Sequence, residues 1–136
     1  MIRKDYILRL VDEFGKFLAK IARLRLEGDY DDALKLIDDI YQGMLNAEPK
    51  VLKSIDTDKL VEYLQQEKKF SNQYLKMIAE LLFEEGHIYI ENGDPISARN
   101  VLEKSKVLIE YLMENDATFS FDWYDKLTAI DNALAI

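Results

Sequence analysis

The chain contains no cysteine and only one histidine among its 136 residues. Without cysteine it can form neither a disulfide nor a thiolate metal site, and it has no cysteine nucleophile. The absence of cysteine also fits a reducing compartment. We therefore expect a cytoplasmic location, and we expect any function to rest on other side chains.

A long uninterrupted apolar run is also missing at the N-terminus. The opening, MIRKDYILRLVDEF, places charged residues inside the first apolar stretch. A signal peptide needs an unbroken apolar core at this position, and a membrane span needs a longer one. The sequence therefore predicts no contact with a membrane.

Positive charge is scarce, with 18 Lys and Arg against 26 Asp and Glu and a formal net charge of −8. A nucleic-acid binder needs a basic face for phosphate contacts, so we expect no nucleic-acid partner. The charge is uneven, because residues 1–27 carry a net +3 and the remainder carries −11. Such an asymmetry favours docking of one part on another or ordered self-association.

Helical spacing of apolar residues is present along the chain, and no segment shows the alternation typical of a strand. The pattern predicts a single all-α domain over residues 1–136, with about six helices in antiparallel pairs. The expected helices run over about 3–27, a stretch reaching about 45, a modest one ending near 68–69, and 73–92, 96–114 and about 118–136. Residues 46–50 are expected to form a connection. The fourth helix is apolar on nearly every side and is expected at the centre.

The clearest element is a helical hairpin over Ala79–Glu110. Gly93 can adopt the left-handed conformation that ends a helix, Asp94 can cap the next helix, and Pro95 suits its first turn. Ser71 and Asn72 similarly provide an N-cap before the fourth helix. The turn and the caps predict both helices and their antiparallel arrangement.

An internal repeat links this hairpin to the first one. Gly28-Asp29 and Gly93-Asp94 are each followed by Ala at the same offset, and the spacing of 65 residues is close to two tetratricopeptide units of 34. Both stretches resemble tetratricopeptide hairpins. On that pattern the second hairpin matches at small, tyrosine, glycine and alanine positions, namely Gly86, Tyr89, Gly93, Ala98 and Ser105. The mechanical expectation is that Gly86 and Ala98 allow the two helices to approach closely, with Tyr89 filling the space beneath.

The opening of the chain also resembles a small bacterial family of unknown function with all-helical, tetratricopeptide-like hairpins. The shared features are Asp-Tyr-Ile, Leu-Ala-Lys-Ile and Gly-Asp-Tyr-x-x-Ala-Leu, which occupy 5–7, 18–21 and 28–34. This resemblance implies a compact bundle of tetratricopeptide-like helical hairpins and implies no activity. Residues 46–78 fit the repeat poorly, and no proline closes either hairpin.

Candidate chemical sites are few. Glu84 precedes His87 by three residues, which is half of a carboxylate-bridged two-metal site, but a single histidine cannot supply the other half. An ion pair of His87 with Glu84 and Glu91 on one helix face explains the spacing. Paired carboxylates such as Glu84-Glu85 are interpreted as a solvated face. We expect no catalytic residue, no metal site and no cofactor.

The first helix carries two further stripes beside its core face, on a wheel of about 100° per residue. The first stripe is small and apolar, with the steps of a helix–helix seam; its residues are Leu8, Gly15, Ala19, Ala22 and Leu26. The second, which we call the basic row, lies beside it and consists of Arg9, Lys16, Lys20 and Arg23. A second copy of the chain or another helix of the same chain could cover the small-residue stripe.

The sequence therefore predicts a non-catalytic protein–protein interaction or scaffold module that self-associates through its first helix, as a homodimer or with another protein partner. The alternative is a small-molecule-binding bundle or enzyme accessory subunit with a pocket between the fourth and sixth helices. The aromatic run Phe119, Phe121, Trp123 and Tyr124 could line such a pocket, or it could pack the last helix over the end of the bundle.

Overall fold

The computed structural model describes residues 4–118 and 122–135, and its fold is all-α. The helices are α1 (Lys4–Leu26), α2 (Tyr30–Gly43), α3 (Pro49–Ser54), α4 (Leu60–Glu62), α5 (Asn72–Glu91), α6 (Pro95–Asn115) and α7 (Asp122–Leu134). A 3-10 turn at Thr57–Lys59 precedes α4, and a π turn at Tyr63–Glu67 follows it. No strand occurs in the described residues.

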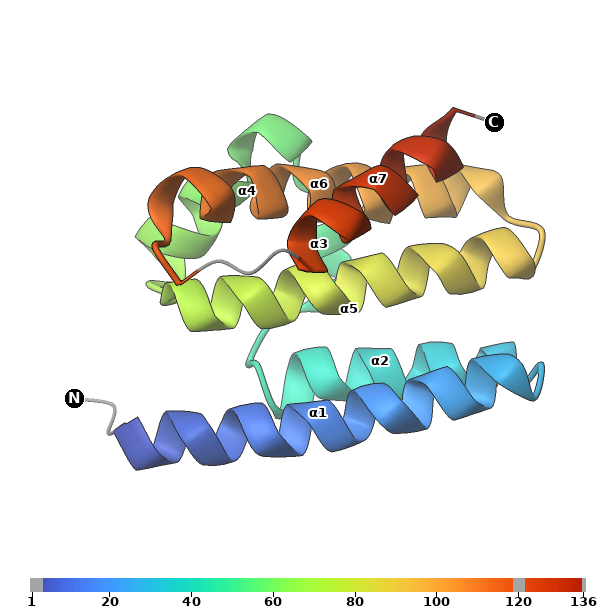
Figure 1. Cartoon of the computed structure of the whole chain (residues 1–136), viewed down its shortest axis with the longest axis horizontal. Coiled ribbons are helices and arrows are strands. Elements are labelled where there is room, and N and C mark those ends of the chain that lie inside the picture. Colours follow the sequence, from blue (N-terminus) through green and yellow to red (C-terminus); the bar gives the residue numbers. More distant parts are fainter. Residues whose placement is uncertain (1–3, 119–121, 136) are drawn as a thin grey trace.

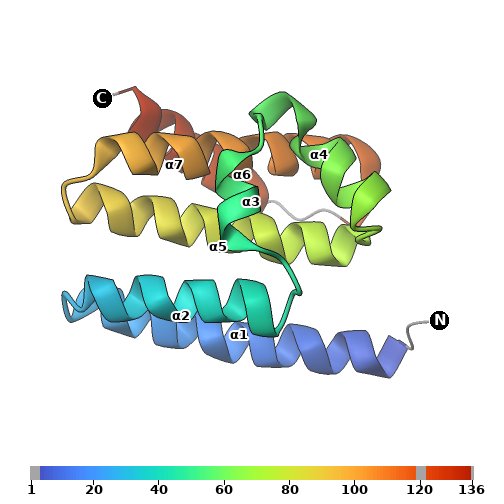
Figure 2. The same ribbon diagram turned by 180° about the vertical axis from the view of Figure 1, so that it is seen from behind.

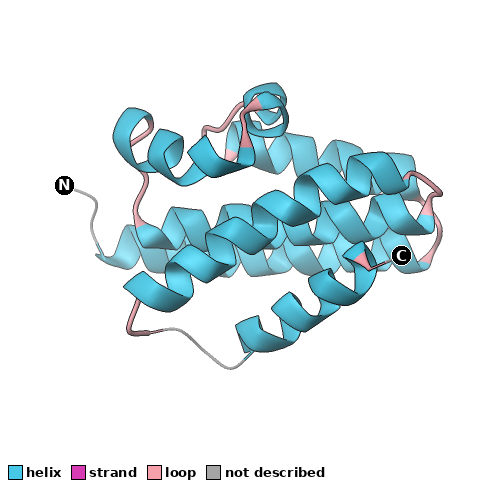
Figure 3. Cartoon of the chain, turned by 90° about the horizontal axis from the view of Figure 1, so that it is seen from above, coloured by secondary structure: helices cyan, strands magenta, loops and turns pink. Residues whose placement is uncertain are grey.

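The long helices pair as two antiparallel hairpins, α1 with α2 and α5 with α6 (Figures 1 and 2). The first hairpin packs on α5 through both of its helices. Seen from above in Figure 3, α7 and the segment from α3 to α4 lie on opposite sides of α6. The hairpin of α1 and α2 therefore forms one edge of the molecule, and no described helix lies beyond it (Figures 1 and 2).

The turn between α5 and α6 forms as its residues predict. Gly93 has a φ of 78°, in the left-handed region. The Oδ1 atom of Asp94 accepts a hydrogen bond of 3.1 Å from the backbone N–H of Ser97, which caps α6, and Pro95 is the first residue of that helix. The Oγ atom of Ser71 accepts a longer bond of 3.4 Å from the backbone N–H of Tyr74 at the start of α5. These predictions are confirmed.

The interior of the α5–α6 hairpin differs from the expectation in one detail. A Cβ atom added to Gly86 would lie 2.4 Å from Cγ and Cδ2 of Leu102. The absence of a side chain at Gly86 therefore makes room for Leu102, which lies one helical turn after Ala98, the residue expected to face Gly86. Ala98 is itself buried. Ser105 adds a buried hydrogen bond of 2.8 Å from its hydroxyl to the carbonyl oxygen of Ala79. The two helices thus approach closely, with Leu102 as the side chain against Gly86.

Helix α5 is the central helix, as expected from the apolar residues on nearly every side of it. Its buried residues are Leu75, Met77, Ile78, Ala79, Leu81, Leu82, Glu85, Gly86 and Ile88. The first hairpin reaches this core through a smaller set of side chains, which includes Leu10, Phe14 and Ile21 of α1 and Ile37 and Tyr41 of α2. The core therefore lies around α5, and α1 contributes from the edge.

The segment between the hairpins was predicted incorrectly in part. Residues expected to be a connection include the start of α3, whose buried Pro49 and Leu52 pack on the core. The modest third helix is broken into a 3-10 turn, one turn of α-helix and a π turn, and Lys69 ends it with a φ of 56°. The last helix begins at Asp122 rather than at Thr118, while Ser120 lies outside the described residues.

Candidate interaction surfaces on the first hairpin

The small-residue stripe of α1 lies on the surface. Leu8 is 60% exposed and Leu26 is 84% exposed. Gly15 and Ala19 are exposed, and a Cβ added to Gly15 would have no neighbour within 4 Å. Only Ala22 is half-buried. No described helix of the chain therefore covers the stripe, and its contact with a partner stays a prediction.

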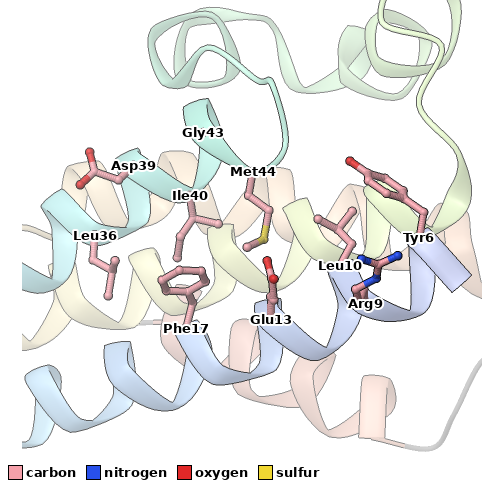
Figure 4. A pocket seen from close by; sticks show the side chains of 10 residues that line it. All are labelled: Tyr6, Arg9, Leu10, Glu13, Phe17, Leu36, Asp39, Ile40, Gly43 and Met44. Carbon is pink, nitrogen blue, oxygen red and sulfur yellow. The ribbon is translucent and has the colours of Figure 1, made fainter.

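A second apolar surface of α1 is a groove, which sequence reasoning missed. The groove has a volume of about 480 Å³ and lies between α1 and α2. Its lining residues are Tyr6, Arg9, Leu10, Glu13 and Phe17 of α1, with Leu36, Asp39, Ile40, Gly43 and Met44 of α2. In Figure 4 the side chains of Phe17, Leu36 and Ile40 point toward one another across it. The floor of the groove is therefore apolar.

The groove is the part of the predicted core face of α1 that the other helices do not cover. Tyr6 is 50% exposed, although its helical spacing places it on the same face of α1 as Leu10 and Phe17. Leu10 is buried and Phe17 is half-buried. The apolar arc of α1 extends past the surface that α2 and α5 cover, since Tyr6 is exposed and Phe17 is only half-buried. The excess apolar surface remains open to solvent as the groove.

Opposite charges border the two sides of the groove. On α1, Arg9 and Glu13 line it, and Lys16 and Lys20 follow Arg9 at steps of seven and four residues, which keeps them on the same side of the helix. On α2, Asp39 lines it, and Asp32 lies seven residues earlier. We call Asp32 and Asp39 the acidic row. The α1 rim is thus mainly basic, with Glu13 as an acidic residue within it, and the α2 rim carries the acidic row.

The charges of both rows are available for further contacts. Lys16 lies 3.6 Å from Asp12 and Lys35 lies 3.6 Å from Asp39, each one turn apart within its own helix. These four side chains are 60–77% exposed. Exposed pairs of this kind contribute little to stability and exchange readily. Arg23, the last residue of the basic row, is also exposed.

On the side of α1 that faces α5, Arg25 forms a bridge between the helices. Its guanidinium lies 3.2 Å from Glu84 and 3.3 Å from Glu91. The predicted ion pair of His87 with these carboxylates is therefore wrong. His87 instead packs against Phe83 with ring centroids 4.4 Å apart, and its Nδ1 lies 2.9 Å from the carbonyl oxygen of Phe83. The carboxylates join the two hairpins because Arg25 reaches them from α1.

A buried polar cluster joins the same hairpins deeper in the structure. Glu85 is 1% exposed and accepts hydrogen bonds of 3.1 Å from the hydroxyls of Tyr41 on α2 and Tyr89 on α5. Nζ of Lys53 on α3 lies 2.5 Å from Oε2 of Glu85 and 3.7 Å from Asp38. The interpretation of Glu84-Glu85 as a solvated face is wrong, since Glu85 faces the interior and Glu84 is half-buried against Arg25.

The electrostatics of the cluster follow from burial and pairing. Burial raises the pKa of Glu85, although Lys53 and the two tyrosines oppose the shift. Burial alone would lower the pKa of Lys53, but Glu85, with smaller contributions from Tyr89 and Asp38, outweighs it, so that the pKa is raised overall. Burial and the same carboxylate raise the pKa of Tyr41. The carboxyl group is enclosed and bonded on every side, which suits a fixed structural link.

The backbone of α3 is held from a third helix. The carbonyl oxygen of Lys53 accepts hydrogen bonds of 3.0 Å from Nδ2 of Asn100 and 3.4 Å from Nζ of Lys104, both on α6. Lys104 also donates to Oδ1 of Asn100 at 2.6 Å. Lys53 therefore connects α2, α5 and α6 through its side chain and its carbonyl group. The only sequence feature that indicates this polar cluster is the helical spacing of Glu85, which lies four residues before Tyr89.

A hollow of about 410 Å³ lies where α5, α6 and α7 meet. Its apolar lining includes Ile90, Ile96 and Leu134, and Arg99 donates a hydrogen bond of 2.9 Å to the carbonyl oxygen of Leu134. Of the aromatic run before α7, Trp123 is buried and Tyr124 is 53% exposed, while Phe119 and Phe121 lie outside the described residues. Trp123 packs the last helix on the bundle.

Comparisons with known proteins do not indicate a role for these surfaces. No protein-family model, curated protein or solved structure gives a significant match to this chain. Within the described residues, none of the helices combines the length and the apolar character needed to span a bilayer. The same part of the chain holds no group of three or more His, Cys, Asp or Glu side chains arranged for a metal ion. The candidate site therefore rests on the geometry of the first hairpin.

Proposed function

We propose that this chain is a non-catalytic protein–protein interaction or scaffold module that self-associates through its first helix. The observation that carries the proposal is the position of α1 and α2 at the edge of the molecule. Helix α1 there exposes two separate apolar surfaces, the small-residue stripe and the groove. Apolar side chains that are exposed at an edge of the molecule and bordered by charged residues are typical of a protein-interaction site.

The composition supports a second copy as the partner. Residues 1–27 carry a net +3, whereas the rest of the chain carries −11, so one copy offers a basic helix to the acidic remainder of another. Opposite charges on the two contacting surfaces steer the encounter and fix its orientation. The tetratricopeptide-like arrangement of the hairpins, which is part of the proposal, is one that commonly serves binding rather than catalysis.

Sedimentation equilibrium of the purified chain, together with native mass spectrometry, tests the proposal. We expect a dimer whose mass is twice 15.9 kDa, without a co-purifying small molecule. A monomer at every concentration that can be reached would contradict self-association. The same mass spectrum would reveal a bound ligand, so the two readouts are obtained together.

A second candidate function is supported by the hollow between α5, α6 and α7. Its apolar lining and the adjacent Arg99 suit a small amphipathic molecule, as in the sequence-based alternative of a ligand-binding bundle or enzyme accessory subunit. An excess mass on the native protein that disappears on denaturation would favour this function. Substitution of Ala133 by Trp should then fill the hollow and abolish the excess mass.

A further inference from the structure

We propose that the groove between α1 and α2 is the seat of a second copy of this chain, with the basic row of each copy lying along the acidic row of the other. The inference deepens the proposed function and rests on it. It selects one of the two surfaces of α1 and predicts the orientation of the partner.

The groove has the shape and lining for a helical partner. Its apolar floor is formed from both helices and runs from Leu10 and Met44 to Phe17 and Leu36. Gly43 lies on its α2 side without a neighbour within 4 Å, so an approaching backbone meets no side chain there. Two such grooves placed face to face would bury the apolar floors of both copies and form the interior of a four-helix bundle.

The charges on the rims decide how the copies are oriented. Helices α1 and α2 run antiparallel (Figure 1), and a twofold axis parallel to them places α1 of one copy over α2 of the other. Lys16 and Lys20 of each copy then lie along Asp39 and Asp32 of its partner. A twofold axis across the helices instead places α1 over α1, which opposes the two basic rows with only Glu13 of each copy to offset them along the groove. Complementarity therefore selects the first arrangement, in which every neighbouring pair of helices is antiparallel.

The small-residue stripe offers no equivalent complementarity. The carboxylates of α5 on that side of α1, Glu84 and Glu91, are already engaged by Arg25 of the same chain. The aspartates of the groove rim are more exposed and have at most a weak surface pair within their own helix. The partner's lysines would thus find more exposed and more weakly paired carboxylates at the groove than beside the stripe.

Two charge-reversed variants test the arrangement. The acidic variant carries Lys16→Glu and Lys20→Glu, so that both rims are negative. The basic variant carries Asp32→Lys and Asp39→Lys, so that both rims are positive. All four positions are exposed, so circular dichroism should show both variants folded. Sedimentation velocity is measured for the wild type, for each variant and for their equimolar mixture, and Ala19→Arg on the stripe is the matched control.

We expect the wild type and Ala19→Arg to be dimers and each charge variant alone to be a monomer. The mixture should form a heterodimer, because the acidic rims of one variant meet the basic rims of the other. If both charge variants stay dimeric while Ala19→Arg becomes monomeric, the groove assignment is wrong and the proposed self-association stands. If the wild type itself is monomeric at all concentrations, both proposals fail.

Discussion

At the scale of single residues, the glycines divide into those that the backbone requires and those that it does not. Gly93 has a φ of 78°, a conformation that a β-branched residue resists. We expect Gly93→Val to lower the free energy of unfolding by about 1–2 kcal/mol. Urea denaturation followed by circular dichroism measures the change, and an unaltered midpoint would show that Gly93 does not adopt this conformation.

Gly15 is the matched contrast, since it lies within α1 with open space around its Cα atom. Gly15→Ala should raise the free energy of unfolding by about 0.5–1 kcal/mol, because alanine restricts the unfolded chain and clashes with nothing in the same copy. The same denaturation experiment checks this. A loss of stability would indicate that Gly15 is packed against another surface.

Gly86 is required by packing rather than by backbone conformation. Gly86→Ala would place a methyl group 2.4 Å from Cγ of Leu102, so either the Leu102 side chain must shift or α5 and α6 must separate. We expect a loss of about 1–3 kcal/mol in the free energy of unfolding. The double variant Gly86→Ala/Leu102→Ala should be more stable than the sum of the two single losses predicts. Strictly additive losses would mean that the two residues are not in contact.

Residue by residue, the sequence predicted conformations better than environments. Gly93, Asp94 and Ser71 act locally, so their types and positions alone predicted the turn and the caps. Glu85 could not be placed from sequence, because its burial depends on Lys53 and Tyr41, which are 32 and 44 positions away in the chain. A carboxylate on a helix is normally solvated unless a distant partner compensates its desolvation.

At the scale of elements, α3 acts as a link because Lys53 reaches the buried carboxylate of Glu85. Lys53→Met removes one partner of this pair and leaves the other buried, which we expect to cost about 3 kcal/mol. Lys50→Met on the same helix is exposed and should change stability by less than about 0.5 kcal/mol. Thermal melts of both variants measure the difference. If they coincide, the cluster does not hold α3 in place.

The end of α6 predicts a dependence of stability on pH. The hydroxyl and backbone N–H of Thr118 donate to Asp116 at 2.6 and 2.9 Å and, with Lys76 at 3.0 Å, lower the pKa of Asp116 to about 2. A carboxyl group whose pKa is lowered in the folded state stabilises the protein at pH values above its ordinary pKa near 3.8. This contribution is lost as the pH falls toward 2.

Asp116→Asn should therefore lower the melting temperature at pH 7 and leave it nearly unchanged at pH 2. Melting curves across this range measure the effect. A constant difference between the variant and the wild type at all pH values would contradict the assigned pKa. Glu114→Gln, an exposed change two residues earlier, is the control for a general loss of negative charge.

Elements with a strong period and local caps were predictable, and short ones were not. Helices α5 and α6 were predicted to within one residue at each end. Helix α3 has only six residues, too few to show a helical period, and it is held by contacts from α6 to the carbonyl group of Lys53. Its stability comes from tertiary contacts, so its own sequence carries little signal.

At the scale of the whole molecule, the charge asymmetry seen in the sequence corresponds to a particular distribution of charged side chains on the first hairpin. The basic row of α1 and the acidic row of α2 follow the two sides of one groove, whose charged lining residues are Arg9, Glu13 and Asp39. The sequence identified the basic row but not the groove, because a groove depends on how far α2 covers the apolar face of α1. The small-residue stripe was identified correctly as distinct from the core, and its exposure follows from the position of α1 at the edge.

The most direct test of the account is disulfide trapping between copies, which the absence of native cysteine makes clean. Lys16→Cys and Asp39→Cys are prepared separately, mixed at equal concentration, oxidised and analysed by non-reducing electrophoresis and mass spectrometry. We predict an efficient mixed disulfide between the two variants, because α1 of one copy lies over α2 of the other. Efficient trapping of Lys16→Cys with itself, without the mixed product, would place α1 over α1 and contradict the account.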